Sequence, residues 1–367
     1  MPLDSASTSS DSEFPPHLLQ VPGFIDQVTQ HTLATAHKRQ PALALGGALA
    51  LLGTLTGRKV CDELNTRTNV YCLGVCPSGW GKEQPHRVNR ELLLLAGAAE
   101  FIGPEGFASH AGLISAVERQ PSILFQLDQP GRLLQAASDP DRAPHLYHSI
   151  VSTLMSLFTS SCTVFNGNRY TTDTKKSIVV DQPNACVLGT TSPKAFNESL
   201  TVESISGGFM SRVLAFEASQ TPPKKQRPDR SPLPDAAIAM TRWWARFSPP
   251  GNLHKETPQP LVVHTEAAAA SKFDAVDDLA YQREAMLREP LGTLWTRVTE
   301  KARKLALLYA CSADHEQPRI DSDAAQWACE LSLYLTERMI YLASHRIAEN
   351  SLRAKSECVG QTNKPSL

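Results

Sequence analysis

The stretch from Tyr71 to Glu83, YCLGVCPSGWGKE, constrains the fold of this 367-residue chain more than any other segment. The apolar run 69–76 predicts a short buried strand, and the glycine-rich turn after it leads into a helix that starts near Lys82. A phosphate-binding loop, G-x-x-x-x-G-K-[ST], requires this strand–loop–helix order. The match is incomplete, because Cys76 occupies the first position and Glu83 follows the lysine.

Phosphate loops bind anions because small residues let backbone N–H groups close around the phosphates at a helix N-terminus. The residues expected to line this loop are Pro77, Ser78, Gly79, Trp80 and Gly81. Lys82 would place its charge on the β- and γ-phosphates of ATP, and the Glu83 carboxylate could hold Mg²⁺ in place of the usual hydroxyl. An unrelated glycine-rich turn between a strand and a helix remains the alternative.

A second acidic position follows 46 residues after Lys82, where the buried run ILFQLDQ ends. P-loop NTPases need an acidic group at the end of a neighbouring strand to hold the metal ion. Asp128 is predicted to be that group, and capping of the next turn is its alternative role. Hydrolytic members usually carry a glutamate at the next position, where this chain has Gln129, so we expect firm Mg-ATP binding and slow hydrolysis.

Two further segments carry candidate residues. Thr190 and Thr191, at the end of the predicted strand in VLGTTSPKAF, could contact the γ-phosphate or the attacking water, or could be ordinary turn hydroxyls. Arg212 precedes another predicted strand in GGFMSRVLAFE and could reach the nucleotide of an adjacent subunit as an arginine finger. A structural salt bridge is the alternative for Arg212.

These blocks together resemble a family of phage and prophage proteins, classed as a domain of unknown function and often described as helicase-like or primase–helicase. The blocks that carry the resemblance are PSGWGKE, LFQLDQPGRLLQ, VLGTTSPKAF, GGFMSRVLAFE and WTRVTEKARKLALLYACS, in that order, over roughly residues 22–345. The resemblance implies an α/β fold with a P-loop NTPase core, a sheet of RecA or AAA+ type, related to ring-forming replicative helicases.

Superfamily 3 helicases carry a β-hairpin that grips DNA in the ring pore, and NGNRYTTDTKK at residues 166–176 lies at the analogous place. By this resemblance Arg169, Lys175 and Lys176 would contact phosphates and Tyr170 would stack on a base. A solvated surface hairpin is the alternative.

Composition and patterning predict how the chain is organised. A formal net charge of −1 argues against a protein coated in positive charge, and scattered cysteines suggest buried thiols in a reducing cytoplasm. The longest apolar run, 41–57, is too short to span a membrane, so no membrane partner is expected. The predicted parts are disordered tails at 1–16 and 351–367, a helical N-terminal segment 17–68, an ATPase core 69–218, a proline-rich linker region 219–260 and a helical C-terminal bundle 261–350.

The preferred interpretation is a ring-forming, helicase-like ATPase that acts on single-stranded DNA in phage or prophage replication. One alternative is a nucleotide-gated loading or assembly factor that binds ATP without translocating. The other alternative is a small-molecule kinase that uses the same loop. DNA-stimulated turnover separates the first two, and an arginine that acts only between subunits would exclude the kinase.

Overall fold

The computed structural model of the chain describes residues 13–139, 145–167, 178–218, 224–249, 258–287 and 289–362, with side chains as far as residue 349. The α-helices are α1 (Phe24–Ala34), α2 (Pro41–Leu55), α3 (Gln84–Leu95), α4 (His110–Arg119), α5 (Gly131–Ser138), α6 (His145–Thr159), α7 (Pro193–Ser199), α8 (Val202–Ser206), α9 (Asp235–Arg246), α10 (Ala267–Met286), α11 (Val298–Ala313) and α12 (Ser322–Thr362). The strands are β1 (Val60–Cys61), β2 (Tyr71–Val75), β3 (Ser122–Asp128), β4 (Val164–Asn166), β5 (Val179–Asp181), β6 (Asn184–Thr191), β7 (Val213–Glu217), β8 (Leu261–Val262), β9 (His264–Thr265) and β10 (Arg319–Ile320). Short 3₁₀ turns cover Pro16–Leu19, Ala99–Phe101, Ser160–Cys162, Met210–Arg212 and Leu291–Leu294.

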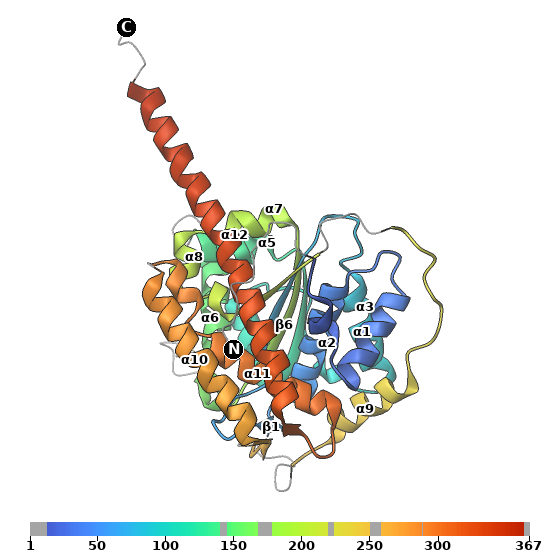
Figure 1. The fold of residues 1–367 in the computed structure, drawn as a ribbon. Coiled ribbons are helices and arrows are strands. Elements are labelled where there is room, and N and C mark those ends of the chain that lie inside the picture. The colour runs from blue at the N-terminus through green and yellow to red at the C-terminus, as the bar shows by residue number, and fades with distance from the viewer. Residues whose placement is uncertain are drawn as a thin grey trace, which may run out of the picture.

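The central sheet has four parallel strands in the order β3–β6–β2–β7 (Figure 1). The chain passes from β2 to β3, returns to place β6 between them, and then adds β7 on the other side of β2. Because the strands run in one direction, Val75, Asp128, Thr191 and Glu217 end at the same edge of the sheet. The expectation of an α/β protein is confirmed at the level of a parallel sheet with helices around it.

The two faces of the sheet bury different residues of the same strands, because successive side chains of a strand point to opposite faces. Cys72 and Phe216 pack in the core around α2, in which only Pro41 among the fifteen residues is not fully buried. Tyr71 and Leu73 pack in a second core with α4, α5 and α6 on the other face. Helices cover both faces, which explains why the strands are apolar runs without alternation.

The helices after residue 260 pack directly on this core. A single hydrophobic cluster runs through α1, α2, the sheet, α9, α11 and α12. The Trp327 indole in α12 donates to the Leu18 carbonyl at 3.0 Å, and Arg338 of the same helix pairs with Glu217 at the end of β7 at 2.8 and 3.1 Å. The predicted N-terminal, central and C-terminal parts therefore share one core.

Some predicted boundaries differ in the structure. The predicted linker region contains α9, whose amphipathic sequence buries Trp244 completely against the core. Helix α12 continues to Thr362, beyond the predicted tail boundary at 351, because the sequence there contains many helix-forming residues and its first glycine is at 360. At the other end, the Phe14 ring packs edge-on against Tyr334 with centroids 5.2 Å apart, so a residue of the predicted tail packs against α12.

No helix in the described segments combines the length and the apolar character that crossing a membrane would require. The seven cysteines with described side chains are free thiols, and six of these are buried.

Candidate nucleotide-binding site

The loop between β2 and α3 has the backbone of an anion cradle. Gly79 and Gly81 have φ values of 74° and 88°, a region in which residues with a side chain are strained. The N–H groups of Ser78, Gly79, Gly81, Lys82 and Glu83 donate no hydrogen bond to any acceptor in the described residues. Five backbone donors just before α3 therefore have no protein acceptor within the described segments, as a loop that binds an anion requires.

The segment between α1 and α2 supports this loop. Lys38 donates from Nζ to the Gly79 carbonyl at 2.7 Å, and Gln40 donates from Nε2 to the Trp80 carbonyl at 3.2 Å. A Cβ added to Gly81 would lie 2.6 Å from the Lys38 carbonyl oxygen, so only glycine fits at that position. The sequence analysis did not single out Lys38 or Gln40, because their pairing with the loop spans about 40 residues and follows no short pattern.

Lys82 and Asp128 meet at the carboxyl edge of the sheet. Lys82 Nζ lies 2.9 Å from Asp128 Oδ1, although the residues are 46 positions apart. The Lys82 side chain is 10% exposed, whereas that of Asp128 is 67% exposed. The lysine is therefore largely buried, and the carboxylate is open to solvent.

Strand β6 separates β2 from β3 and brings both threonines to the same edge. Thr190 Oγ1 donates to Asp128 Oδ1 at 3.3 Å, and the Gln129 N–H donates to the Thr190 carbonyl at 2.8 Å. The Thr191 carbonyl accepts from the Cys76 N–H at 2.9 Å, which fixes the start of the loop. The structure thus gathers the loop, Asp128 and both threonines, as the sequence analysis expected.

The ionisation of the site follows from these contacts. Partial burial acts to raise the pKa of Asp128, but the hydrogen bond and charge of Lys82, the Thr190 hydroxyl and nearby His86 together hold that pKa below its ordinary value. Burial lowers the pKa of His86, in the first turn of α3, to about 4. Asp128 is thus anionic and His86 neutral at pH 7. No short motif marked His86.

Glu83 directly follows Lys82 in the chain, and Gln129 directly follows Asp128. Glu83 is the exposed N-cap residue of α3, and Gln129 directly follows β3 with a φ of 52°. Carboxylate and hydroxyl oxygens are the donors that suit Mg²⁺, which in nucleotide sites takes one or two carboxylates together with phosphates and water. Nowhere among the described side chains do three His, Cys, Asp or Glu gather as a metal cage.

Arg212 lies at the opposite end of the sheet from the loop. It directly precedes β7, whose first residue pairs with Tyr71, whereas the loop follows Val75. Five residues of strand separate the two levels by about 17 Å. Arg212 therefore does not contact the loop of its own chain.

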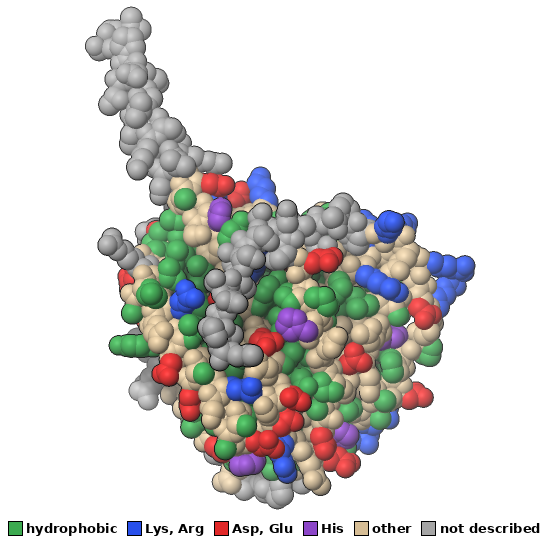
Figure 2. Space-filling model, in the orientation of Figure 1, with side chains coloured by type: hydrophobic (Ala, Val, Ile, Leu, Met, Phe, Trp, Pro, Cys, Tyr) green, Lys and Arg blue, Asp and Glu red, His purple; other side chains and the backbone are tan. Residues whose placement is uncertain are grey.

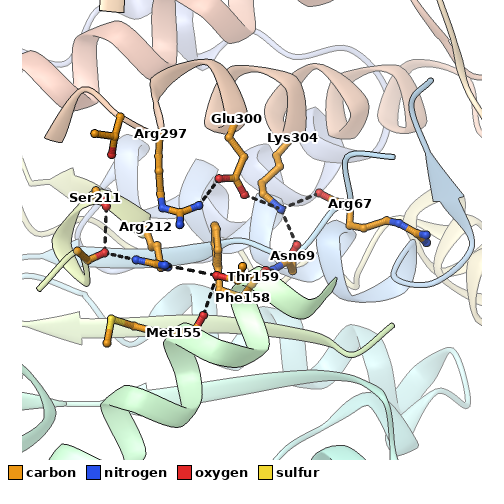
Figure 3. Close-up of polar contacts among 12 residues, drawn as sticks. Arg67, Asn69, Met155, Phe158, Thr159, Ser211, Arg212, Arg297, Glu300 and Lys304 are labelled. Atoms are coloured by element: carbon orange, nitrogen blue, oxygen red, sulfur yellow. Dashed lines mark hydrogen bonds and ion pairs between the residues drawn. The ribbon is translucent and has the colours of Figure 1, made fainter. Parts of the chain in front are cut away.

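The surroundings of Arg212 contain three cations around one ring (Figure 3). The guanidinium of Arg212 donates to the Gly208 carbonyl and, at 3.3 Å, to Thr159 Oγ1. It lies 5.9 Å from the Phe158 ring centre, as does Arg297, and Lys304 Nζ lies 4.7 Å from it. Burial, and then the charge of Arg297, lower the pKa of Arg212.

Glu300 is the carboxylate of this cluster. It bonds Arg297 and lies 3.6 Å from Lys304 Nζ. Arg212 forms no ion pair with a carboxylate in the described residues, so the salt bridge considered for it is not seen there. This cluster thus contains three cations and one carboxylate.

The hairpin predicted to contact DNA falls mostly outside the described residues. Strands β4 and β5 pair antiparallel at its base, but Arg169, Tyr170, Lys175 and Lys176 belong to residues 168–177, which are not described.

No protein-family model matches the chain, and a search of the curated proteins finds no significant match.

Proposed function

We propose that this chain is a P-loop ATPase that binds Mg-ATP at the β2–α3 loop. The observation that carries the proposal is the 2.9 Å contact between Lys82 and Asp128, beside a loop with five available N–H donors. A phosphate-binding lysine and a metal-binding carboxylate are the two charged groups that an NTPase brings together at the end of its sheet.

The strand order supports the same proposal. In open parallel sheets, ligands bind outside the carboxyl ends of the strands. They bind at the point in the strand order where the connections from neighbouring strands run in opposite directions, which is called the switch point. Here the chain leaves β2 toward β3 on one side, and β7 is added on the other side. The loop after β2 lies at that switch point, as a sheet of RecA or AAA+ type would place it.

In this proposal Lys82 exchanges partners when nucleotide binds. Its ammonium leaves Asp128 for the β- and γ-phosphate oxygens, while the loop N–H groups donate to the same phosphates. Asp128, once released, and Glu83 would hold the magnesium ion, which neutralises phosphate charge when bound. Thr190 remains close enough to orient the carboxylate.

Hydrolysis should be slow, because Gln129 follows Asp128 where a carboxylate base is usual. Glutamine can orient a water molecule by hydrogen bonds but cannot accept its proton as a carboxylate does, and loss of a general base costs on the order of 10²–10⁴ in rate.

We further propose that the ATPase assembles as a homo-oligomeric ring and acts on DNA in the manner of a phage replication helicase. Arg212 lies far from the loop of its own chain but is not paired with a carboxylate in the described residues, so its use by a neighbouring subunit is compatible with the geometry. One residue, Gln129, favours the alternative of a loading or assembly factor, because such a factor needs to bind ATP but does not need to hydrolyse it fast.

The test begins with calorimetric titration of Mg-ATP into the natural protein and into Lys82→Ala. Binding should be lost in the variant, because the phosphates lose the loop's cation, and Lys194→Ala on the exposed surface of α7 is the matched control. Equal ATP affinity of Lys82→Ala and the natural protein would remove the proposal. DNA-stimulated turnover would then favour the helicase-like ATPase, and binding without stimulation would favour the loading factor.

The ring is tested separately by mixing Arg212→Ala with Lys82→Ala subunits. Each variant supplies the group that the other lacks, so mixed rings should recover part of the turnover. If rings form and no mixing ratio restores turnover, Arg212 is not a finger between subunits.

A further inference from the structure

A basic segment lies along the α1–α2 connection, next to the phosphate loop. Residues 224–234, KKQRPDRSPLP, run extended before α9 (yellow in Figure 1). The Gln226 N–H donates to the His37 carbonyl at 2.9 Å, and the Asp229 N–H donates to the Ala34 carbonyl at the same distance. Leu233 is buried in the core, so the segment is held at both of its ends.

The cations of this segment are exposed, and no carboxylate of the described residues pairs with them. Residues 224–230 contain four cations and one carboxylate, Asp229, which accepts from the Ser231 N–H at 3.0 Å. The four cations are Lys224, Lys225, Arg227 and Arg230. None of them forms an ion pair within the described part of the chain, although the whole protein carries a net charge of only −1.

Two further cations connect this segment to the loop. Lys38 and Arg39 lie in the α1–α2 connection that the segment contacts, and Lys38 also bonds the Gly79 carbonyl of the loop at 2.7 Å. We call these six residues the basic rim: Lys38, Arg39, Lys224, Lys225, Arg227 and Arg230. Figure 2 shows Lys and Arg side chains gathered at the upper right of the molecule, where Figure 1 draws the yellow segment.

We propose that the basic rim binds the phosphodiester backbone of single-stranded nucleic acid. Residues 224–230 in extended form span about 20 Å, so their cations reach well beyond the phosphates of a single nucleotide held in the loop. A chain of regularly spaced phosphates can contact all of them at once, and exposed cations on a fixed backbone are the groups that such a chain contacts.

The carboxylates near the rim are too few to cancel it. Asp229 lies within the segment, and Glu83 and Glu91 lie on the neighbouring loop and α3, where Arg87 adds another cation. Lys38 joins the rim to the loop, so the nucleic acid would lie against the site at which ATP binds. The inference deepens the proposed function and rests on it only for the identity of the neighbouring nucleotide site.

The experiment compares two triple variants with equal charge change. The test variant is Lys224→Ala/Lys225→Ala/Arg227→Ala, and the control variant is Lys272→Ala/Arg283→Ala/Arg319→Ala on α10 and β10. Fluorescence anisotropy with a labelled oligothymidylate gives the affinity at several KCl concentrations, and calorimetry gives the Mg-ATP affinity. Each neutralised phosphate contributes about 0.7 to the slope of log K against log salt on single strands, so the test variant should lose about two units of slope.

The expected result is a flatter salt dependence in the test variant only, with unchanged Mg-ATP binding. An unchanged slope would overturn the proposal, and so would a slope lost only in Lys175→Ala/Lys176→Ala of the hairpin. Rim-dependent binding to phosphatidylserine vesicles without any rim-dependent DNA binding would also overturn it, in favour of a membrane surface. If DNA binds through the rim while Mg-ATP does not bind at all, the proposal for the rim is supported and the proposed ATPase function is refuted.

Discussion

Two glycines of the loop allow a matched test of whether its observed conformation is the one that binds ATP. Gly79 and Gly81 both have positive φ, 74° and 88°, so alanine is strained at either position. They differ in surroundings: a Cβ on Gly79 meets nothing within 4 Å, whereas a Cβ on Gly81 would lie 2.6 Å from the Lys38 carbonyl oxygen. The two substitutions therefore separate backbone strain from a steric clash.

The magnitudes follow from these two terms. Left-handed backbone costs a residue with a side chain about 1–2 kcal/mol, so Gly79→Ala should weaken Mg-ATP binding by roughly 5- to 30-fold if the loop must keep its conformation to bind. Gly81→Ala adds a clash that no side-chain movement can relieve, because the atom 2.6 Å away is the backbone carbonyl oxygen of Lys38. The loop must then move away from Lys38, and we expect at least a 100-fold loss of affinity.

Calorimetric titration of Mg-ATP measures both affinities, and thermal unfolding followed by circular dichroism checks that each variant folds. A Gly81→Ala protein that folds and binds Mg-ATP no more weakly than Gly79→Ala would refute the reasoning, since the close approach of Lys38 would then have no part in shaping the site. Lys38→Gln serves as a control, because it removes the ammonium that bonds Gly79 while keeping the carbonyl that excludes a side chain at Gly81.

Three other predictions concern turnover, stability and pH. Gln129→Glu should raise ATP turnover, measured by phosphate release, well above that of the natural protein at similar ATP affinity, because it supplies the missing base. Flat or lower turnover would mean that Gln129 already positions the water or that another group is the base. Arg338→Met should lower the free energy of unfolding by about 2–4 kcal/mol, because it leaves Glu217, 20% exposed, without its partner. Urea denaturation should show that the double variant with Glu217→Gln recovers part of that loss. Additive losses from the two substitutions would argue against a coupled pair. The lowered pKa of His86, about 4, means that between pH 6.5 and 4 the unfolded chain binds a proton that the folded chain does not. Stability should therefore fall as pH drops through that window, by at most about 1.4 kcal/mol per pH unit, and His86→Gln should flatten the fall; identical pH profiles would contradict this.

The sequence alone determined those features whose physical cause is local. A buried strand, a turn with two glycines and a helix with Lys82 at its start are encoded within thirteen residues, because apolar runs, positive φ and helix initiation each depend on near neighbours. The burial of α2 was readable in the same way, since a helix that is apolar on all sides can only be internal. Asp128 was identified because it ends a continuous apolar strand.

Only the tertiary structure decided which distant residues meet. The insertion of β6 between β2 and β3 depends on strand pairing across more than 60 residues, which no local pattern specifies, and it is this order that brings Thr190 to Asp128. The same holds for Lys38 under the loop and for the basic segment docked on the α1–α2 connection, in a region whose composition predicted only a linker. Arg212 was recognised from its position before a strand, but its distance from the loop follows from parallel pairing, which places the start of β7 at the opposite edge from the end of β2. Local chemistry is written in short stretches of sequence, whereas the partners of each group depend on packing energies summed over the whole chain.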